Sequence, residues 1–290
     1  MKKNIQLLVI DPQNDFCDLP ASWCPPNPVS GKAMAPALPV AGAHADMLRL
    51  AGLIRRAGAA ISGITVTLDS HHRFDIAHPT FWQTGAGDGV APFTPITASQ
   101  LRSGEFIPKD KAMLPKALAY ADELARRGRY SLMVWPVHCE MGSWGHNVHA
   151  AVKAAYNDWE DSRQGVVRKV GKGDNPWTEH YSALQAEVPD PDDAATQLNL
   201  PLIASLDQAD MILIAGEASS HCVRATAEDL ADHLPSGRPG KIVLLTDCMS
   251  PVAGFEAQHR AFLGDMAGRG VLASSCAQIL DTLGVLADKA

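Results

Sequence analysis

The stretch Met211–Leu234, MILIAGEASSHCVRATAEDLADHL, decides how the rest of the chain is interpreted. It opens with five apolar residues, a run of the length and type of a strand that is buried on both faces. Gly216 interrupts this run, Ser219 and Ser220 are residues that favour a helix N-cap, and apolar residues then recur at helical spacing. The stretch therefore predicts a strand, a tight turn and a helix, with Cys222 in the first turn of that helix.

Cys222 has two interpretations at this point. A thiolate is the nucleophilic form of cysteine, and the partial positive charge of a helix N-terminus favours that form. The ordinary alternative is a buried structural cysteine, which is the commoner role of a single Cys. The position between a strand and a helix makes Cys222 a candidate nucleophile, and side chains elsewhere in the chain must decide.

The composition of the chain narrows its class. Its 290 residues, 46% of them hydrophobic, are enough for one large α/β domain or two small ones with a sizeable core. The net charge of -7 comes without a cluster of basic residues, so neither nucleic acid nor a membrane surface is an expected partner. The first apolar run stops at Asp11 without a cleavage site, and no stretch reaches transmembrane length. We therefore expect a cytoplasmic protein with free thiols.

Apolar runs and helical patterns alternate along the chain. Strands are predicted at residues 5–10, 59–68, 130–135, 165–170, 211–215 and 241–246, with helices between them. This alternation predicts one three-layer α/β/α domain over residues 1–290, with a six-stranded, mainly parallel sheet. From 70 to about 113 no period is sustained, and long irregular segments of this kind are typically functional or interaction segments. We predict that the domain contains an inserted segment at about 81–129.

Polar residues follow five of the predicted strands. In parallel sheets ligands bind at the carboxyl ends of the strands, so these residues are expected at one edge. Five strands that each deliver an acid, a base, a cation or a thiol to one edge exceed what chance would give. The residues are Asp11, Asp69 with His71, His138, Lys172 and Cys222.

Asp11, Lys172 and Cys222 together indicate nucleophilic catalysis. Asp11 is a candidate to accept the thiol proton and to return it later to a leaving group. Lys172 is expected to favour the ionised carboxylate and the thiolate, and N–H groups at the helix start are expected to bind an oxyanion. Each residue also has an ordinary interpretation, since Lys is usually solvated and a carboxylate at a strand end can cap a loop. Lys169 is the rival of Lys172.

A second group of side chains has the chemistry of metal ligands. Asp69 and His71 are two residues apart at a strand end, so their side chains lie on the same side. His138 follows the next predicted strand, and one carboxylate with two imidazoles suits zinc, iron or manganese. His72 points to the opposite side and is interpreted as structural, whereas His78 is a candidate for a further ligand.

The strings around these residues resemble one protein family. They are DPQNDF after the first predicted strand, D-x-H after the second, WPVHCEMGSWG, KGDNPWTEHYSA and GEASSHCVRATAED. In this order they resemble the nicotinamidase branch of the isochorismatase-like cysteine hydrolases. The resemblance covers the chain from Ile5 to about Ser275, and the last string is the most specific.

This resemblance implies the isochorismatase-like hydrolase fold and a defined set of site residues. The family spacing favours Lys172 over Lys169, and the peptide bond Glu217–Ala218 would be cis. The implied residues are Asp11, Lys172 and Cys222 for the catalytic triad; Ala218 and Cys222 for the oxyanion hole; Asp69, His71 and His138 for the metal; and Phe16, Trp135, Tyr181 and His221 for the ring-binding pocket.

The resemblance also implies an activity. The expected reaction is the hydrolysis of nicotinamide to nicotinate and ammonia through a Cys222 thioester, a step of NAD salvage. The expected cofactor is a divalent metal ion, with zinc as the first choice and iron or manganese as alternatives. The expected partner is a small-molecule amide, and the chain is expected to form a homo-oligomer.

Three departures from the family pattern leave alternatives open. The segment from about 81 to 129 is longer than in compact nicotinamidases, ASSHC replaces the more usual A-T-D-x-C, and YSAL stands where YSAF is common. The substrate could therefore be another small amide or a ureido compound. A non-enzymatic alternative is a ligand-binding or redox-sensing homologue that keeps the site geometry without turnover.

Overall fold

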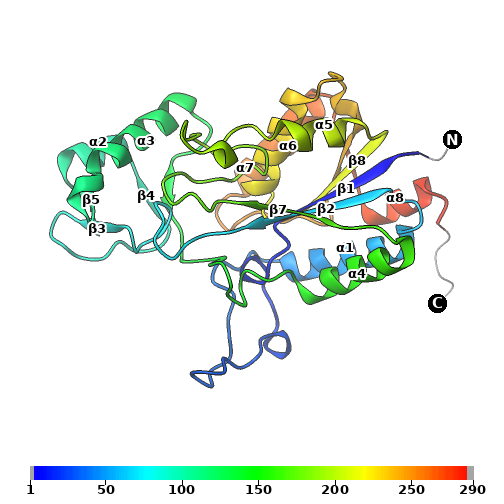
Figure 1. The fold of residues 1–290 in the computed structure, drawn as a ribbon, viewed down its shortest axis with the longest axis horizontal. Coiled ribbons are helices and arrows are strands. Elements are labelled where there is room, and N and C mark those ends of the chain that lie inside the picture. Colours follow the sequence, from blue (N-terminus) through cyan, green and yellow to red (C-terminus); the bar gives the residue numbers. More distant parts are fainter. Residues whose placement is uncertain (1–2, 286–290) are drawn as a thin grey trace.

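Six parallel strands form the central sheet of the computed structural model, which describes residues 3–285 (Figure 1). Their order across the sheet is β10-β9-β8-β1-β2-β7. The strands are β1 (Ile5–Ile10), β2 (Gly63–Asp69), β7 (Arg168–Lys172), β8 (Met211–Gly216), β9 (Ile242–Leu245) and β10 (Leu272–Ser274). The predicted α/β class with a six-stranded sheet is confirmed.

Helices cover both faces of this sheet, which makes the three predicted layers (Figure 1). One face carries α1 (Ala43–Ala57), α4 (Ala150–Arg163) and α8 (Cys276–Thr282), and α1 packs against both of the others. The other face carries α5 (Leu200–Asp207), α6 (Cys222–His233) and α7 (Glu256–Gly268). Most apolar residues of α1, among them Met47, Leu50 and Ile54, recur at helical spacing and are buried, so they form the layer between helix and sheet.

The two middle strands, β1 and β8, are almost entirely apolar and buried. They pair in parallel with Ile10 opposite Gly216, so the chain leaves both strands at the same edge. Gly216 has φ +124, and a Cβ atom there would collide with the backbone of Ile10. Only glycine allows this close approach together with this backbone conformation, and the turn after β8 depends on it.

One predicted strand belongs to a different sheet. The apolar run at 130–135 forms β6 (Leu132–Val134), which pairs antiparallel with β4 (Thr94–Ile96) and not with the central sheet. The sixth central strand is instead β10, which pairs with β9. The reason is that an apolar run indicates burial but does not specify the neighbouring strand, and the partner of this run lies in the irregular segment.

The predicted insertion at about 81–129 builds a lobe beside the sheet (Figure 1, left). It contains β3 (Trp82–Thr84), α2 (Ala98–Ser103), β5 (Phe106–Pro108) and α3 (Leu114–Arg127), and β3 pairs with β5. The lobe encloses its own hydrophobic core, made by Ile76, Phe81, Trp82, Val90, Ile96, Leu101, Ala117, Tyr120, Ala121, Leu124, Leu132 and Val134.

Five short 3-10 helices complete the described secondary structure, and none of the helices within residues 3–285 has the length and hydropathy that a membrane span requires. The 3-10 helices are Asn14–Phe16, Ala21–Trp23, Lys111–Met113, Ala194–Thr196 and Pro239–Lys241.

Candidate active site

The structure brings Asp11, Lys172 and Cys222 together at the carboxyl edge of the central sheet. Asp11 follows β1, Lys172 ends β7, and Cys222 begins α6. The ammonium Nζ of Lys172 lies 2.9 Å from Asp11 Oδ2 and 3.6 Å from Cys222 Sγ. The exposed fractions of the three residues are 0%, 2% and 6%, so this contact takes place almost out of water.

Lys172 is held by more than the predicted pair. Its Nζ also donates to Asp69 Oδ1 and to the carbonyl of His180, each at 2.9 Å. Burial alone would lower the pKa of Lys172, but the charges of Asp11 and Asp69 outweigh burial and hold that pKa well above its ordinary value. Lys172 is therefore a permanent cation at the centre of the site.

Lys169, the alternative candidate for the catalytic lysine, lies outside this site. Its Nζ is 4.3 Å from the centre of the Tyr156 ring and donates to the carbonyl of Val167 at 3.3 Å. The strand β7 therefore presents Lys172, and not Lys169, to Asp11 and Cys222.

The charge state of Cys222 differs from the expectation based on the helix terminus. Burial raises the pKa of the Cys222 thiol well above its ordinary value, and the opposing effect of Lys172 is smaller. Burial also raises the pKa of Asp11 against the lowering effect of Lys172. Loss of water around the sulfur disfavours the thiolate, and the cation of Lys172 does not offset this effect.

Asp11 is fixed in place by its neighbour on β2. Asp11 Oδ1 accepts a hydrogen bond from Thr67 Oγ1 at 2.5 Å, and the Asp11 N–H donates to the same hydroxyl oxygen at 3.0 Å. The backbone of Asp11 adopts φ +42, an uncommon conformation for a residue other than glycine. This pair of bonds leaves Oδ2 of the carboxylate facing Lys172.

The turn before Cys222 is built differently from the predicted N-cap. The helix α6 begins at Cys222 with His221 as N-cap, and no side chain caps it. Ser220 instead accepts the N–H of Val252 at 3.1 Å and lies 2.9 Å from His221 Nδ1, while Ser219 is fully buried. Ser220 therefore serves tertiary contacts and not the helix end, and the hydroxyl of Ser219 is buried without a hydrogen-bond partner.

The backbone of this turn has two features that the resemblance implied. The peptide bond Glu217–Ala218 is cis. Among the hydrogen bonds of the described residues, none is donated by the N–H of Ala218 or of Cys222. The carbonyl of Ala218 accepts from His221 and Val223, which closes the turn tightly. Two free N–H donors next to the sulfur are the arrangement that an oxyanion hole requires.

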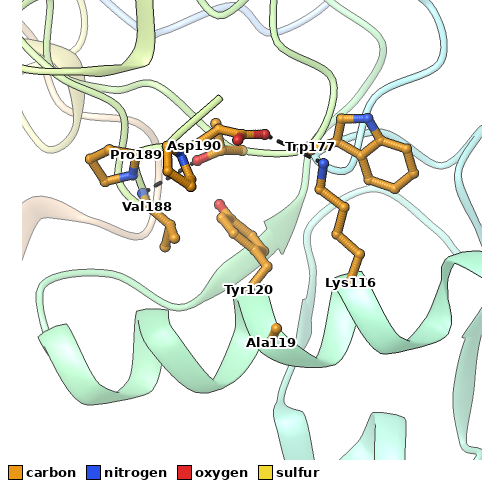
Figure 2. Close-up of a pocket in the computed structure, with 9 residues that line it drawn as sticks. Lys116, Ala119, Tyr120, Trp177, Val188, Pro189 and Asp190 are labelled. Carbon is orange, nitrogen blue, oxygen red and sulfur yellow. Dashed lines mark hydrogen bonds and ion pairs between the residues drawn. The ribbon is translucent and has the colours of Figure 1, made fainter. Parts of the chain in front are cut away.

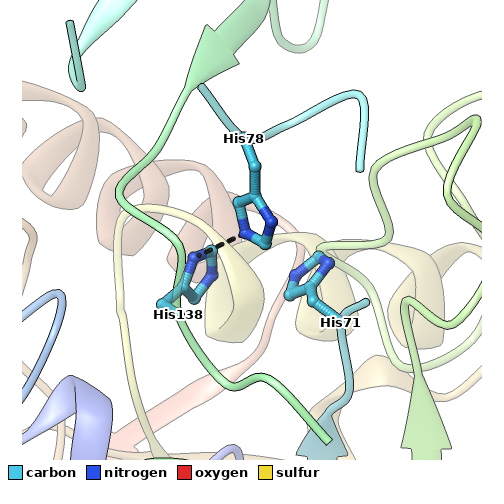
Figure 3. A group of neighbouring side chains, drawn as sticks. All are labelled: His71, His78 and His138. Carbon is cyan, nitrogen blue, oxygen red and sulfur yellow. Dashed lines mark hydrogen bonds between the residues drawn. The ribbon is translucent and has the colours of Figure 1, made fainter. Parts of the chain in front are cut away.

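A cluster of buried ligand-type atoms lies beside the triad (Figure 3). Asp69 Oδ2 is 3.1 Å from His71 Nε2 and 3.3 Å from His138 Nε2. The other ring nitrogens are engaged, because His71 Nδ1 lies 3.0 Å from Asp75 Oδ2 and His138 Nδ1 lies 2.8 Å from the carbonyl of Pro136. Histidine ligands of metal ions typically have their second ring nitrogen hydrogen-bonded to a carboxylate or a carbonyl, as Nδ1 is in both rings here.

Two further residues can extend this cluster. His78 Nε2 lies 3.3 Å from His138 Nδ1, its Nδ1 is buried without a hydrogen-bond partner, and burial lowers its pKa to about 3 (Figure 3). Glu179 Oε1 lies 3.9 Å from His71 Nε2. The sequence indicated His78 but not Glu179, which sits in an irregular segment where no spacing marks it as a ligand. The donor set of carboxylates and imidazoles fits a divalent metal ion.

A mostly apolar pocket opens onto Cys222. The implied ring-binding residues Phe16, Trp135, Tyr181 and His221 all line it, and Trp135 Nε1 donates to the Tyr181 hydroxyl at 2.9 Å. Burial lowers the pKa of His221 to about 3, so this imidazole is neutral. The remaining lining residues are Leu38, Asp69, His138, Glu179, Ala218, Cys222 and Val252.

The lobe at 81–129 contributes no residue to this lining within the described part of the chain. Its nearest contribution is Phe93, whose ring meets Trp135 edge to face at a centroid distance of 5.8 Å. The lobe therefore supports a pocket wall from outside, and the pocket itself is made mostly by the family-like strings, with Leu38 and Val252 added from other segments.

A separate cleft lies between α3 and residues 177–191 (Figure 2). Tyr120 and Trp177 form its apolar part, and the Lys116 ammonium lies 4.4 Å from the Trp177 ring centre. The Tyr120 hydroxyl accepts the N–H of Glu179 at 3.0 Å. Through this bond the lobe helps to place the segment that brings Glu179 to the metal-type cluster.

Comparisons with known proteins agree with this geometry at the level of the fold. No family model and no curated protein matches the sequence. The yeast nicotinamidase bound to the inhibitor nicotinaldehyde superposes with TM-score 0.60 at 18% identity, over 93% of this chain and 99% of that chain. The chain has the fold of nicotinamidases and isochorismatase-family hydrolases.

Two other solved structures show the same likeness. The nicotinamidase/pyrazinamidase of Acinetobacter baumanii gives TM-score 0.61 at 19% identity, over 96% of this chain and 99% of that chain. The pyrazinamidase of Pyrococcus horikoshii in complex with zinc gives TM-score 0.52 at 18% identity, over 94% of this chain and 99% of that chain. The isochorismatase-like hydrolase fold is thereby confirmed.

Proposed function

We propose that this protein is a cysteine amidohydrolase with nicotinamide as its substrate. The observation that carries the proposal is the contact of Lys172 with both Asp11 and Cys222 in a buried site. A buried thiol beside a cation and a carboxylate, with two free N–H donors, has the parts that acyl transfer from an amide needs.

The chemistry assigns a role to each residue. Cys222 Sγ attacks the amide carbon as Asp11 takes its proton, and the N–H groups of Ala218 and Cys222 bind the oxyanion. Asp11 then gives its proton to the leaving nitrogen, the C–N bond breaks, and ammonia leaves a thioester. Water, deprotonated by Asp11, hydrolyses the thioester to the acid, and the proton returns to the sulfur.

We propose that Asp69, His71 and His138 hold a divalent metal ion, with zinc as the first choice and His78 or Glu179 as a further ligand. The bound ion would supply a template for a ring nitrogen. The solved pyrazinamidase of Pyrococcus horikoshii is a zinc complex, which supports this choice. Asp69 also contacts Lys172 at 2.9 Å, so the metal-type cluster and the triad share one carboxylate.

The pocket favours a flat heteroaromatic ring. Trp135, Tyr181 and His221 surround the space next to Cys222 with aromatic faces and edges. Aromatic walls of this kind select planar ligands, and the carboxylate–imidazole cluster at one side would receive a ring nitrogen. Benzamide lacks that nitrogen, so we expect it to react more slowly than nicotinamide.

Ammonia release from a small panel of amides tests the proposed function. Nicotinamide should be turned over fastest, benzamide more slowly, and Cys222→Ala should release no ammonia from either. Turnover of a linear ureido acid alone would keep the mechanism and replace the substrate. Absence of turnover on the whole panel by metal-loaded protein would favour a ligand-binding or redox-sensing homologue.

We also propose a cytoplasmic location, a role in NAD salvage and a homo-oligomeric state. The first two follow from the expected reaction and from cysteines that are all free in the structure. Light scattering on the purified protein tests the third, and a monomeric mass at micromolar concentration would contradict it.

A further inference from the structure

Two cysteines outside the active site lie in sulfur–sulfur contact. Cys248 follows β9, Cys276 is the first residue of α8, and their Sγ atoms are 3.1 Å apart. Both are free and buried, with exposed fractions of 0% and 7%. They come together because β9 and β10 are neighbours, so the segments after the two strands leave the sheet side by side.

We propose that Cys248 and Cys276 are a redox-active pair that forms a reversible disulfide, a modification site separate from Cys222. A disulfide has an S–S bond of about 2.05 Å, so the two sulfurs need to approach by about 1 Å. The movement is small because the thiols already face each other across neighbouring segments.

The surroundings favour a disulfide over a soft metal ion at the same place. Asp247 is the third ligand-type residue of this cluster, but both of its carboxylate oxygens accept the N–H of Cys276, at 2.9 and 3.1 Å. The hydrogen bond between Cys248 and Cys276, together with burial, raises the pKa of Cys248 far above its ordinary value. The engaged carboxylate leaves a metal ion only two sulfur ligands here, whereas a disulfide needs no more than the two sulfurs and is neutral.

The oxidation requires a two-electron oxidant, and a peroxide is the class that we propose. Cys276 is the entry point because it is the more exposed of the two. Its sulfur attacks one peroxide oxygen, the O–O bond breaks, and a sulfenic acid and one water form. The Cys248 sulfur then displaces the sulfenic oxygen as a second water. Both thiol protons end in water, and the peroxide takes both electrons.

This disulfide would restrict the motion of residues 248–250, whose carbonyls accept hydrogen bonds from the turn before Cys222. The carbonyl of Cys248 accepts the N–H of Gly216 at 2.9 Å, and the carbonyl of Ser250 accepts the N–H of Ser219 at 2.9 Å. A bond between Cys248 and Cys276 would also enclose the chain that contains α7 and β10. Closing a loop of this size stabilises the folded state by restricting the unfolded chain.

Peptide mapping of the full chain tests the pair. The reduced protein is treated with hydrogen peroxide, quenched with catalase, alkylated and digested without reductant, in parallel with Cys222→Ala to separate the two thiol sites. We expect one linked peptide, Cys248 with Cys276, that dithiothreitol releases. Alkylation of both residues after peroxide, or a link to a different cysteine, would overturn the proposal.

Thermal unfolding gives a second readout. Oxidation should raise the Tm of Cys222→Ala by about 5–10 °C, because a disulfide that closes a loop of this length stabilises by a few kcal/mol. The matched control is Cys222→Ala with Cys276→Ser, whose Tm should not respond to peroxide. Cys248→Ala replaces it if the serine variant does not fold. An equal rise in the control would overturn the proposal, as would stoichiometric cadmium binding that Cys276→Ser abolishes without any disulfide in the wild type.

Discussion

Besides its proposed catalytic role, Lys172 stabilises two buried carboxylates. Its ammonium contacts the carboxylates of Asp11 and Asp69 and the sulfur of Cys222, and all four residues are buried. Two buried carboxylates so close together are tolerated only because this cation lies between them. One charge thus holds the proposed nucleophile, the proposed base and a metal-type ligand in a single cluster.

Replacing this lysine tests its role at the residue scale. Lys172→Met should lower the rate of ammonia release by orders of magnitude, and should lower stability in urea by about 3–5 kcal/mol because buried charge is left unpaired. Lys169→Met, on the same strand but stacked on Tyr156, is the matched control and should change the rate little. If the Lys169 variant were the inactive one, the assignment would be wrong.

The metal ligands can be tested at the same scale. Purified wild-type protein should contain about one equivalent of zinc, iron or manganese per chain, since three protein ligands suit one open site. His71→Ala should lose this metal by elemental analysis, while Cys222 should still react with iodoacetamide. His72→Ala is the control, because His72 is exposed. Equal metal content in wild type, His71→Ala and His138→Ala would show that these side chains are not ligands.

At the scale of elements, the start of α4 makes the fold sensitive to acid. His149 caps α4 by accepting the N–H of Ala151 through Nδ1, its Nε2 lies 2.9 Å from His44 Nδ1, and the Trp23 ring stacks on it. Burial and the nearby His44 lower the pKa of His149 from 6.5 to about 4. The unfolded chain therefore binds more protons between these pH values, and stability falls as pH drops from about 6.5 to about 4.

His149→Asn should weaken this dependence on pH. Asparagine still offers an oxygen to cap the helix but does not titrate. Urea unfolding gives the free energy of unfolding at each pH. Between pH 6.5 and 4 this free energy should fall less steeply in the variant than in the wild type, by up to about 1.4 kcal/mol per pH unit. His233→Asn is the matched control on an exposed histidine. Equal slopes in the wild type and His149→Asn would contradict the explanation.

At the scale of elements, sequence patterns predict the central strands but not every strand partner or every site residue. The central strands β1 and β8 are found because they are continuous apolar runs. The strand β6 was assigned to the wrong sheet because periodicity does not identify a partner. Glu179 was missed for a related reason, since tertiary packing against Tyr120, and not local pattern, brings it to the metal-type cluster.

At the scale of the whole molecule, two separate hydrophobic cores contribute to the free energy of unfolding. The core of the sheet and the core of the lobe are separate clusters, and Trp82 is fully buried in the second. Trp82→Ala should destabilise the lobe by about 3–5 kcal/mol. Hydrogen exchange should then accelerate in α3 while β8 stays protected, whereas Leu50→Ala in the main core should accelerate both. Equal acceleration of β8 by the Trp82 variant would show a single cooperative unit.

The proposed mechanism requires a covalent bond between Cys222 and the acyl group of the substrate. The most direct measurement is intact-mass and peptide analysis of protein that has been acid-quenched during turnover of nicotinamide. We expect a fraction of the chains to carry one nicotinoyl group on Cys222, and no such adduct and no ammonia from Cys222→Ala. Ammonia release by wild type without any adduct, together with an active Cys222→Ala, would contradict the account and assign the hydrolysis to a nucleophile other than this cysteine.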